Sequence, residues 1–113
     1  MKIEADGQIK WNSIEIADNF FKRLIGLTHT KSLKKGEGML ITKCSQIHTF
    51  HMKFCIDVIY LSQTLTVLRV DTICPRRFGP LVKGARNVLE VTAGSAEKNG
   101  ITEGTQLKII YEK

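Results

Sequence analysis

The stretch of sequence that decides the fold is Ile56-Asp57-Val58-Ile59-Tyr60-Leu61-Ser62-Gln63-Thr64-Leu65-Thr66-Val67-Leu68-Arg69-Val70. Residues 56–61 form a short, mostly apolar run of the kind found in buried strands, and β-branched residues recur after it. Three polar residues, 62–64, separate this run from a second one at 65–70. We therefore predict a β-hairpin with strands at 56–61 and 65–70.

Further strand-like segments lie on both sides of this hairpin. Apolar and polar residues nearly alternate from Ile9 to Ala17, with one irregular step that indicates a bulge. Other short apolar or alternating runs occur at 39–42, 87–91 and 105–111. Short strands at close spacing favour an antiparallel arrangement over a parallel α/β fold.

Two short helices are predicted among these strands. Asp18 is a suitable N-cap for a segment with apolar residues at helical spacing, which Gly26 would end. A second helix follows Gly94-Ser95 and stops at Asn99-Gly100. The predicted fold class is mainly β (β-rich α+β): a small antiparallel, jelly-roll-like sandwich or partly open barrel with five to seven strands and two short helices.

The length of 113 residues predicts one domain, 1–113, with a core that needs no disulfide or metal. No run approaches 18 consecutive apolar residues, and residues 1–11 lack the apolar region of a signal peptide, so we expect no membrane span and a cytoplasmic location. Cys44, Cys55 and Cys74 are too few and odd in number for a disulfide framework, which agrees with a reducing compartment. We expect them mainly to fill space in the core.

The formal net charge is +6, from 17 lysine and arginine residues against 11 aspartate and glutamate residues. Such a charge permits attraction to phosphates, acidic polymers or an anionic membrane face. The basic residues are spread along the chain and only 7% of residues are aromatic, a poor match to a stacking surface for single-stranded nucleic acid. The expected partner is a small or acidic ligand of unknown identity, and not nucleic acid.

Residues 44–57 contain the highest density of side chains that can bind a metal or take part in catalysis. They include a C-x3-H-x2-H-x3-C spacing formed by Cys44, His48, His51 and Cys55. Cysteine and histidine are the ligands that zinc prefers. However, the composition favours a strand, and a strand would point Cys44 and His48 to one face and the other two to the opposite face. We therefore expect neither a metal nor a cofactor.

A second set of candidate residues is charged but lies within a mostly apolar segment. On an extended strand, Lys53 and Asp57 share a face, with His48 nearby, and a buried charge needs a partner. Two interpretations remain open: a ligand-binding or acid–base site, or an internal ion pair that fixes strand register. Glu90, set among Val88, Leu89 and Val91, poses the same choice. An acid at such a position usually lies on the solvent face of a strand, and the alternative is that it accepts a hydrogen bond from Lys53 or Arg23.

Four pieces of the chain together resemble a known family. They are Arg23-Leu24-Ile25-Gly26-Leu27, Gly38-Met39-Leu40, Cys44-Ser45-Gln46-Ile47-His48-Thr49-Phe50-His51-Met52-Lys53-Phe54-Cys55-Ile56-Asp57-Val58 and Val88-Leu89-Glu90-Val91-Thr92-Ala93-Gly94. In this order they are similar to the domain-of-unknown-function 192 family, over about residues 14–110. The family commonly has proline at Cys55 and a non-ligand residue at His51, which further weakens the zinc interpretation.

The resemblance implies a small β-rich, jelly-roll-like sandwich with no established biochemical activity. Many members carry a secretion or lipoprotein signal, and some are encoded beside pilus-assembly or secretion components. The matching positions include Gly26 and Met52, together with the ligand-binding candidates, which are Arg23, His48, Thr49, Lys53, Asp57 and Glu90. None of these residues is predicted to be catalytic.

The leading functional hypothesis is a non-enzymatic binding or accessory domain for an acidic ligand, with the Arg76-Arg77 segment supplying positive charge. The alternative is a small hydrolase or transferase that uses Cys44 or His48 with Asp57 as the orienting carboxylate. A third class, weak nucleic-acid binding, predicts an affinity that falls steeply with salt.

Overall fold

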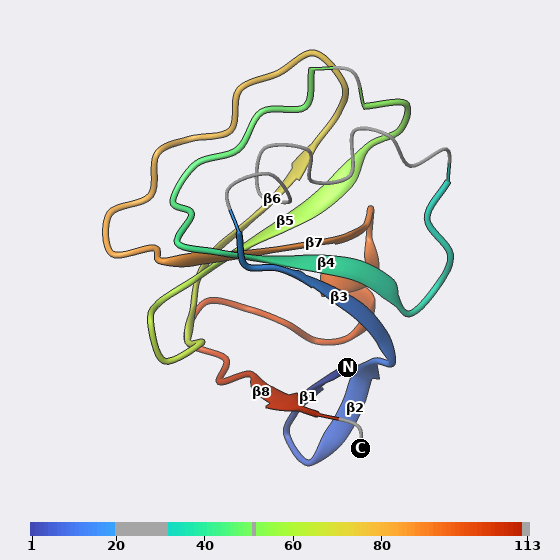
Figure 1. The fold of residues 1–113 in the computed structure, drawn as a ribbon. Coiled ribbons are helices and arrows are strands. Elements are labelled where there is room, and N and C mark those ends of the chain that lie inside the picture. Colours follow the sequence, from blue (N-terminus) through green and yellow to red (C-terminus); the bar gives the residue numbers. More distant parts are fainter. Residues whose placement is uncertain (20–31, 51, 112–113) are drawn as a thin grey trace.

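The computed structural model describes residues 1–19, 32–50 and 52–111, and it contains two β-sheets that share a core (Figure 1). The larger sheet has the strand order β3 (Ser13–Ala17), β4 (Glu37–Thr42), β7 (Asn87–Thr92), β5 (Ile56–Leu61) and β6 (Val67–Ile73). The smaller sheet has the order β2 (Gln8–Trp11), β1 (Lys2–Ala5) and β8 (Lys108–Ile110). The mainly β class of the prediction is therefore confirmed, and the sheets do not close into a barrel.

Strands β5 and β6 form the predicted hairpin, with Ile56 opposite Ile73, although the second strand covers 67–73 and not the predicted 65–70. Strand β5 lies between β7 and β6, and all six of its residues are buried. This burial on both faces explains why the sequence of the strand reads as a nearly continuous apolar run. The prediction of antiparallel pairing holds for the other strand pairs, whereas β3 pairs with β4 in parallel.

Each face of the five-stranded sheet covers a separate hydrophobic cluster. Alternate residues of β5 and β7, such as Ile59 and Leu89, face the small sheet and pack with its Trp11. The intervening residues, such as Val58 and Val88, face two long connecting loops. Figure 1 shows these loops, coloured green and gold to orange, across the large sheet from β1, β2 and β8.

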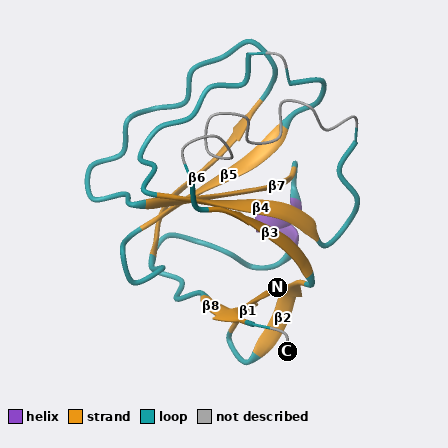
Figure 2. Ribbon diagram, viewed as in Figure 1, coloured by secondary structure: helices purple, strands orange, loops and turns teal. Residues whose placement is uncertain are grey.

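Helix α2 (Ser95–Lys98) follows β7 and lies beside the large sheet (Figure 2). Its N-cap, Gly94, has φ 86° and no side chain with which to cap the helix. The carboxylate of Asp57 does this from β5, because its Oδ2 accepts a hydrogen bond of 3.0 Å from the Ala96 backbone N–H. The other predicted helix, between Asp18 and Gly26, lies almost entirely outside the described residues.

The N-terminal region differs most from the prediction. Strand β1 was not expected, and the single strand predicted at 9–17 is two strands in different sheets, separated by a bend at Asn12. Trp11 and Ile14 are both buried in the core that the sheets share. Three residues apart, they would face opposite sides of one straight strand, so the bend is what allows both to be buried. The described residues thus form eight strands, one more than the predicted maximum.

The predicted strand at 105–111 is confirmed only over the shorter β8. Among residues 1–19, 32–50 and 52–111, no helix has the length and apolar character required to cross a bilayer.

Candidate functional site

The two long loops that cover the large sheet, 43–55 and 74–86, pack against each other, and we call them the basic loop pair. They hold six lysine and arginine residues and no aspartate or glutamate. Since the whole chain has 17 basic and 11 acidic residues, the remainder contains 11 of each and is neutral. The full net charge of +6 therefore comes from the basic loop pair, a concentration that is visible only once the two loops are seen to be neighbours.

A disulfide between Cys55 and Cys74 joins the bases of the two loops. Cys55 directly precedes β5 and Cys74 directly follows β6, so the antiparallel hairpin places them opposite each other. The expectation that these cysteines merely fill the core is wrong, and the argument from unpaired cysteines to a reducing compartment no longer holds. Their positions, Cys55 directly before and Cys74 four residues after the predicted hairpin 56–70, were the sequence signal that could have suggested the pairing.

Thr49 also connects the two loops. Its side chain is fully buried, its hydroxyl donates to the Cys74 carbonyl oxygen at 2.6 Å, and its Oγ1 accepts from the Arg77 backbone N–H at 2.9 Å. The Thr49 backbone N–H in turn donates to the Arg77 carbonyl oxygen at 2.8 Å. The structure thus uses the Thr49 hydroxyl to hold the two loops together.

Three aromatic rings gather where the loops meet. His48 and Phe78 form an isolated antiparallel bridge, and their ring centroids are 6.4 Å apart. Phe50 packs edge to face on Phe78 with centroids 4.8 Å apart and lies 5.5 Å from the His48 ring. Sequence reasoning singled out His48 but missed its contact with Phe78, because Phe78 lies 30 residues away in the other loop.

Asp57 and Lys53 do not share a face, contrary to the prediction. Lys53 is exposed in the loop before β5, so the alternation of a strand does not apply to it. Asp57 is buried toward the small sheet, where its Oδ1 accepts a hydrogen bond of 2.7 Å from Thr72 and its Oδ2 accepts from Ala96. This carboxylate connects β5, β6 and α2.

Glu90 is also buried, but it lies on the other face of the sheet, toward the basic loop pair. It is 4% exposed, and its Oε1 has no hydrogen-bond partner among the described residues. Burial raises the pKa of this carboxyl to about 7. Tyr60 lies one strand away on the same face, and its hydroxyl has no hydrogen-bond partner in the described part of the chain. Burial, followed by the charge of Asp71, raises the pKa of Tyr60 to about 12.

The predicted polar cluster is therefore not one site in the described structure. Asp57 and Glu90 occupy opposite faces of the large sheet, while His48 and Lys53 are exposed in a loop. Arg23, Gly26 and His51 lie outside the described residues. Glu90 is buried, so it does not lie on the solvent face of its strand, and the alternative pairing with Lys53 is not observed among the described residues.

The arrangement of Cys44, His48 and Asp57 bears on the enzyme alternative. Cys44 is a partly buried thiol whose Sγ lies 3.2 Å from the Gln46 carbonyl oxygen. Asp57 faces away from the loop that carries His48, so its carboxylate does not orient the imidazole. Within the part of the chain that the structure describes, no three potential metal ligands gather.

One cavity opens beside the basic loop pair, with a volume of about 550 Å³. Such a volume is in the usual range of small-molecule sites. Its charged side chains are Lys43, directly after β4, and Arg86, just before β7, and no carboxylate of the described residues lines it. The other lining residues are Thr42, Cys44, Ser45, Gln63, Ala85 and Asn87.

Two solved structures have a similar fold. A protein of unknown function from Novosphingobium aromaticivorans superposes with a TM-score of 0.78 at 20% identity, over 85% of this chain and 74% of the other. A protein from Sinorhizobium meliloti, described as a putative transcription regulator, superposes with a TM-score of 0.81 at 17% identity, over 95% of this chain and 89% of the other. At these identities the likeness concerns the fold alone.

Sequence comparison identifies the family of the chain. The chain is 34% identical over 99 residues to a UPF0127 protein of Pyrococcus abyssi, covering 81% of this chain and 82% of that one. It is 30% identical over 92 residues to a UPF0127 protein of Thermococcus sibiricus, covering 78% of this chain and 60% of that one. The family model DUF192, described as an uncharacterized ACR, matches residues 1–109. The chain therefore belongs to the DUF192 family, as its sequence motifs predicted.

Proposed function

We propose that this chain is a non-enzymatic binding domain for a small acidic ligand, held in the cavity between Lys43 and Arg86. The observation that carries this proposal is a cavity of about 550 Å³ whose only charged lining residues are cations. An anion entering it meets two positive charges and no opposing carboxylate. The four other basic residues of the basic loop pair add long-range attraction.

The lining side chains suit a carboxylate or a phosphate. One Arg86 nitrogen, Nη1, donates to the Ala85 carbonyl oxygen at 3.1 Å, which leaves the rest of the planar guanidinium to bind a two-oxygen acceptor. Lys43 supplies a mobile point charge. Ser45 adds a hydroxyl to the lining. Secretion or pilus assembly, which the family resemblance implies, stays an expectation.

The proposal is tested by thermal unfolding with glucuronate, ATP and a hexaglutamate peptide. A ligand present at about 100 times its dissociation constant stabilises the folded state by about 2.7 kcal/mol. We expect one of these anions to raise the melting temperature of the wild type, and Lys43→Gln and Arg86→Gln to abolish that rise.

Matched controls come from a second cavity of about 370 Å³, which is lined by Lys10, Lys35 and Lys98 near α2. Lys10→Gln and Lys98→Gln remove the same amount of charge and should leave the shift intact. The absence of a shift with all three anions would contradict the proposal. A shift lost in the control variants and retained in Lys43→Gln would move the ligand to the second cavity.

A further inference from the structure

The tip of the basic loop pair, residues 76–83, exposes apolar side chains beside positive charges. Phe78 and Leu81 are each 70% exposed, which among the described large hydrophobic residues is matched only by Tyr111. Arg76, Arg77 and Lys83 flank them and are exposed as well. Within the described structure no carboxylate pairs with these three cations.

The tip is held in place by contacts with the neighbouring loop. The Gly79 N–H donates to the Ile47 carbonyl oxygen at 2.8 Å, and the Gln46 side-chain amide donates to the Gly79 carbonyl oxygen at 3.0 Å. A Cβ at Gly79 would lie 2.6 Å from the Tyr60 hydroxyl oxygen, so only glycine lets the tip pack this closely. The ring of Phe50 packs edge to face against the ring of Phe78. The fold therefore fixes Phe78 and Leu81 at the surface, and docking would require little additional ordering.

A lipid bilayer suits a tip of exposed apolar side chains flanked by cations better than a nucleic acid does. Leu81 has no ring on which a base could stack, whereas both Phe78 and Leu81 gain by leaving water for lipid. Phe50 and Phe78 pack at 86° to each other, which is unlike a row of parallel stacking faces. Cations around an apolar tip can remain at the level of anionic headgroups while the tip enters the lipid.

We propose that the loop tip 76–83 docks on the surface of an anionic phospholipid bilayer, with Phe78 and Leu81 inserted between lipids and Arg76, Arg77 and Lys83 on the headgroups. This binding to the membrane is peripheral, because only two side chains, one aromatic and one leucine, enter the lipid interface. This surface is distinct from the cavity between Lys43 and Arg86, so either proposal can fail alone.

The test is co-sedimentation of the full chain with vesicles of phosphatidylglycerol and phosphatidylcholine in equal parts, and with pure phosphatidylcholine. We expect binding to the anionic vesicles only. Phe78→Ser should weaken it roughly tenfold, and Arg76→Gln and Arg77→Gln roughly fivefold each. Leu81→Ser is a second apolar variant, outside the aromatic contacts, and guards against loss of loop structure.

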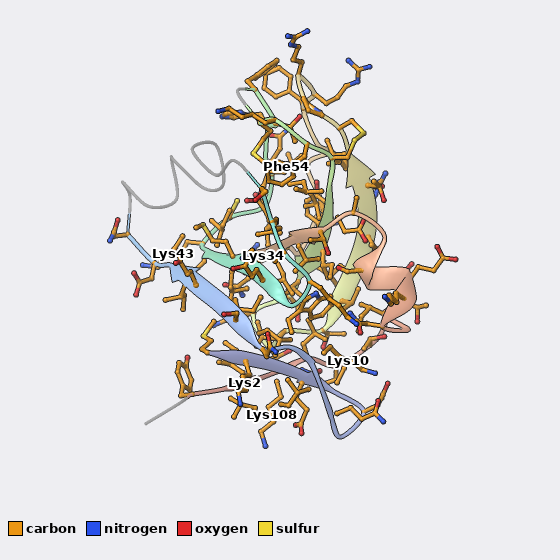
Figure 3. The ribbon with its side chains drawn as sticks, turned by 90° about the vertical axis from the view of Figure 1, so that its right-hand side faces the viewer. Lys2, Lys10, Lys34, Lys43, Phe54 and Lys108 are labelled. Atoms are coloured by element: carbon orange, nitrogen blue, oxygen red, sulfur yellow. A yellow bond between two sulfur atoms is a disulfide. The ribbon has the colours of Figure 1, made fainter. Side chains whose placement is uncertain are left out.

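The opposite end of the molecule supplies matched controls. Tyr111→Ser removes an equally exposed ring that follows β8. Lys2→Gln and Lys108→Gln remove charge from the small sheet, which Figure 3 shows far from the loop tip. These three variants should bind anionic vesicles like the wild type.

Three outcomes would overturn the proposal. The first is no binding to anionic vesicles. The second is binding that Phe78→Ser and Leu81→Ser leave unchanged, which would indicate charge attraction alone. The third is an affinity for an unstructured oligothymidylate that exceeds that for the vesicles and is lost in Phe78→Ser, which would assign the tip to single-stranded nucleic acid.

Discussion

At the scale of single residues, Glu90 is the least typical side chain in the described structure. Its carboxyl is buried in the middle of the central strand β7, between Met39 of β4 and Val58 of β5, and one oxygen has no hydrogen-bond partner there. Burial favours the neutral form, and the pKa of Glu90 therefore rises from 4.5 to about 7.

This shift predicts that stability falls as the pH rises. Below pH 4.5 the carboxyl is protonated in both the folded and the unfolded chain, so it does not affect the difference between them. Between pH 4.5 and about 7 the unfolded chain loses this proton more readily, and the free energy of unfolding falls by about 3 kcal/mol. Glu90→Gln should remove this loss, as measured by urea denaturation at pH 4.5 and pH 8.

Glu15→Gln is a suitable control, because Glu15 lies on the edge strand β3 and is exposed. Its pH dependence should match that of the wild type. A Glu90→Gln variant that loses as much stability as the wild type between the two pH values would show that another group is responsible.

At the scale of elements, the hairpin β5–β6 supports the basic loop pair. The Cys55–Cys74 disulfide closes the end of the hairpin from which both loops leave, and it spans 19 positions of sequence. In the unfolded chain it restricts the segment between the cysteines, and a loop of this length corresponds to a stabilisation of about 3 kcal/mol. The backbone pairing of β5 with β6 extends from Ile56 and Ile73 to Leu61 and Val67, so the strands are also joined by their own ladder.

The double variant Cys55→Ser, Cys74→Ser should therefore lose about 3 kcal/mol in the free energy of unfolding while keeping its β-rich circular dichroism spectrum. Reductant should bring the wild type to the same stability and have no effect on the variant. Cys44→Ser, which alters the cysteine outside the disulfide, should respond to reductant like the wild type. An unchanged unfolding midpoint of the wild type in reductant would contradict the role given to this disulfide.

At the scale of the whole molecule, the two sheets have one core in common. Ile3, Ala5 and Trp11 of the small sheet belong to the same buried cluster as Leu40 and Leu89 of the large sheet. The Trp11 indole N–H also donates to the Ser95 hydroxyl at 3.3 Å, which connects the small sheet to α2. Neither sheet can separate without exposing this cluster to water.

The chain should consequently unfold in one step. Trp11 is the only tryptophan and is 1% exposed, so its fluorescence reports on the junction of the two sheets. Far-UV circular dichroism reports on all the strands. The two signals should give the same urea midpoint, and a fluorescence change at lower urea would show that the small sheet detaches first.

The sequence by itself determined the β-rich class, the central hairpin, the last helix and the family. These features rest on local patterns: the apolar run of β5, the turn after Leu61 and the glycines around Ser95–Lys98. Burial of β5 on both faces produces the same pattern whatever lies next to it, so the strand could be recognised without knowing its neighbours.

Only the tertiary structure decided which residues meet. Asp57 and Glu90 look alike in sequence, since each is an acid within an apolar run, yet the register of β5 and β7 sends them to opposite faces of the sheet. The disulfide, the aromatic contacts of Phe78 and the cavity beside Arg86 likewise join segments about 20 to 40 positions apart. Such contacts depend on strand order and loop packing, and no periodicity within one segment encodes them.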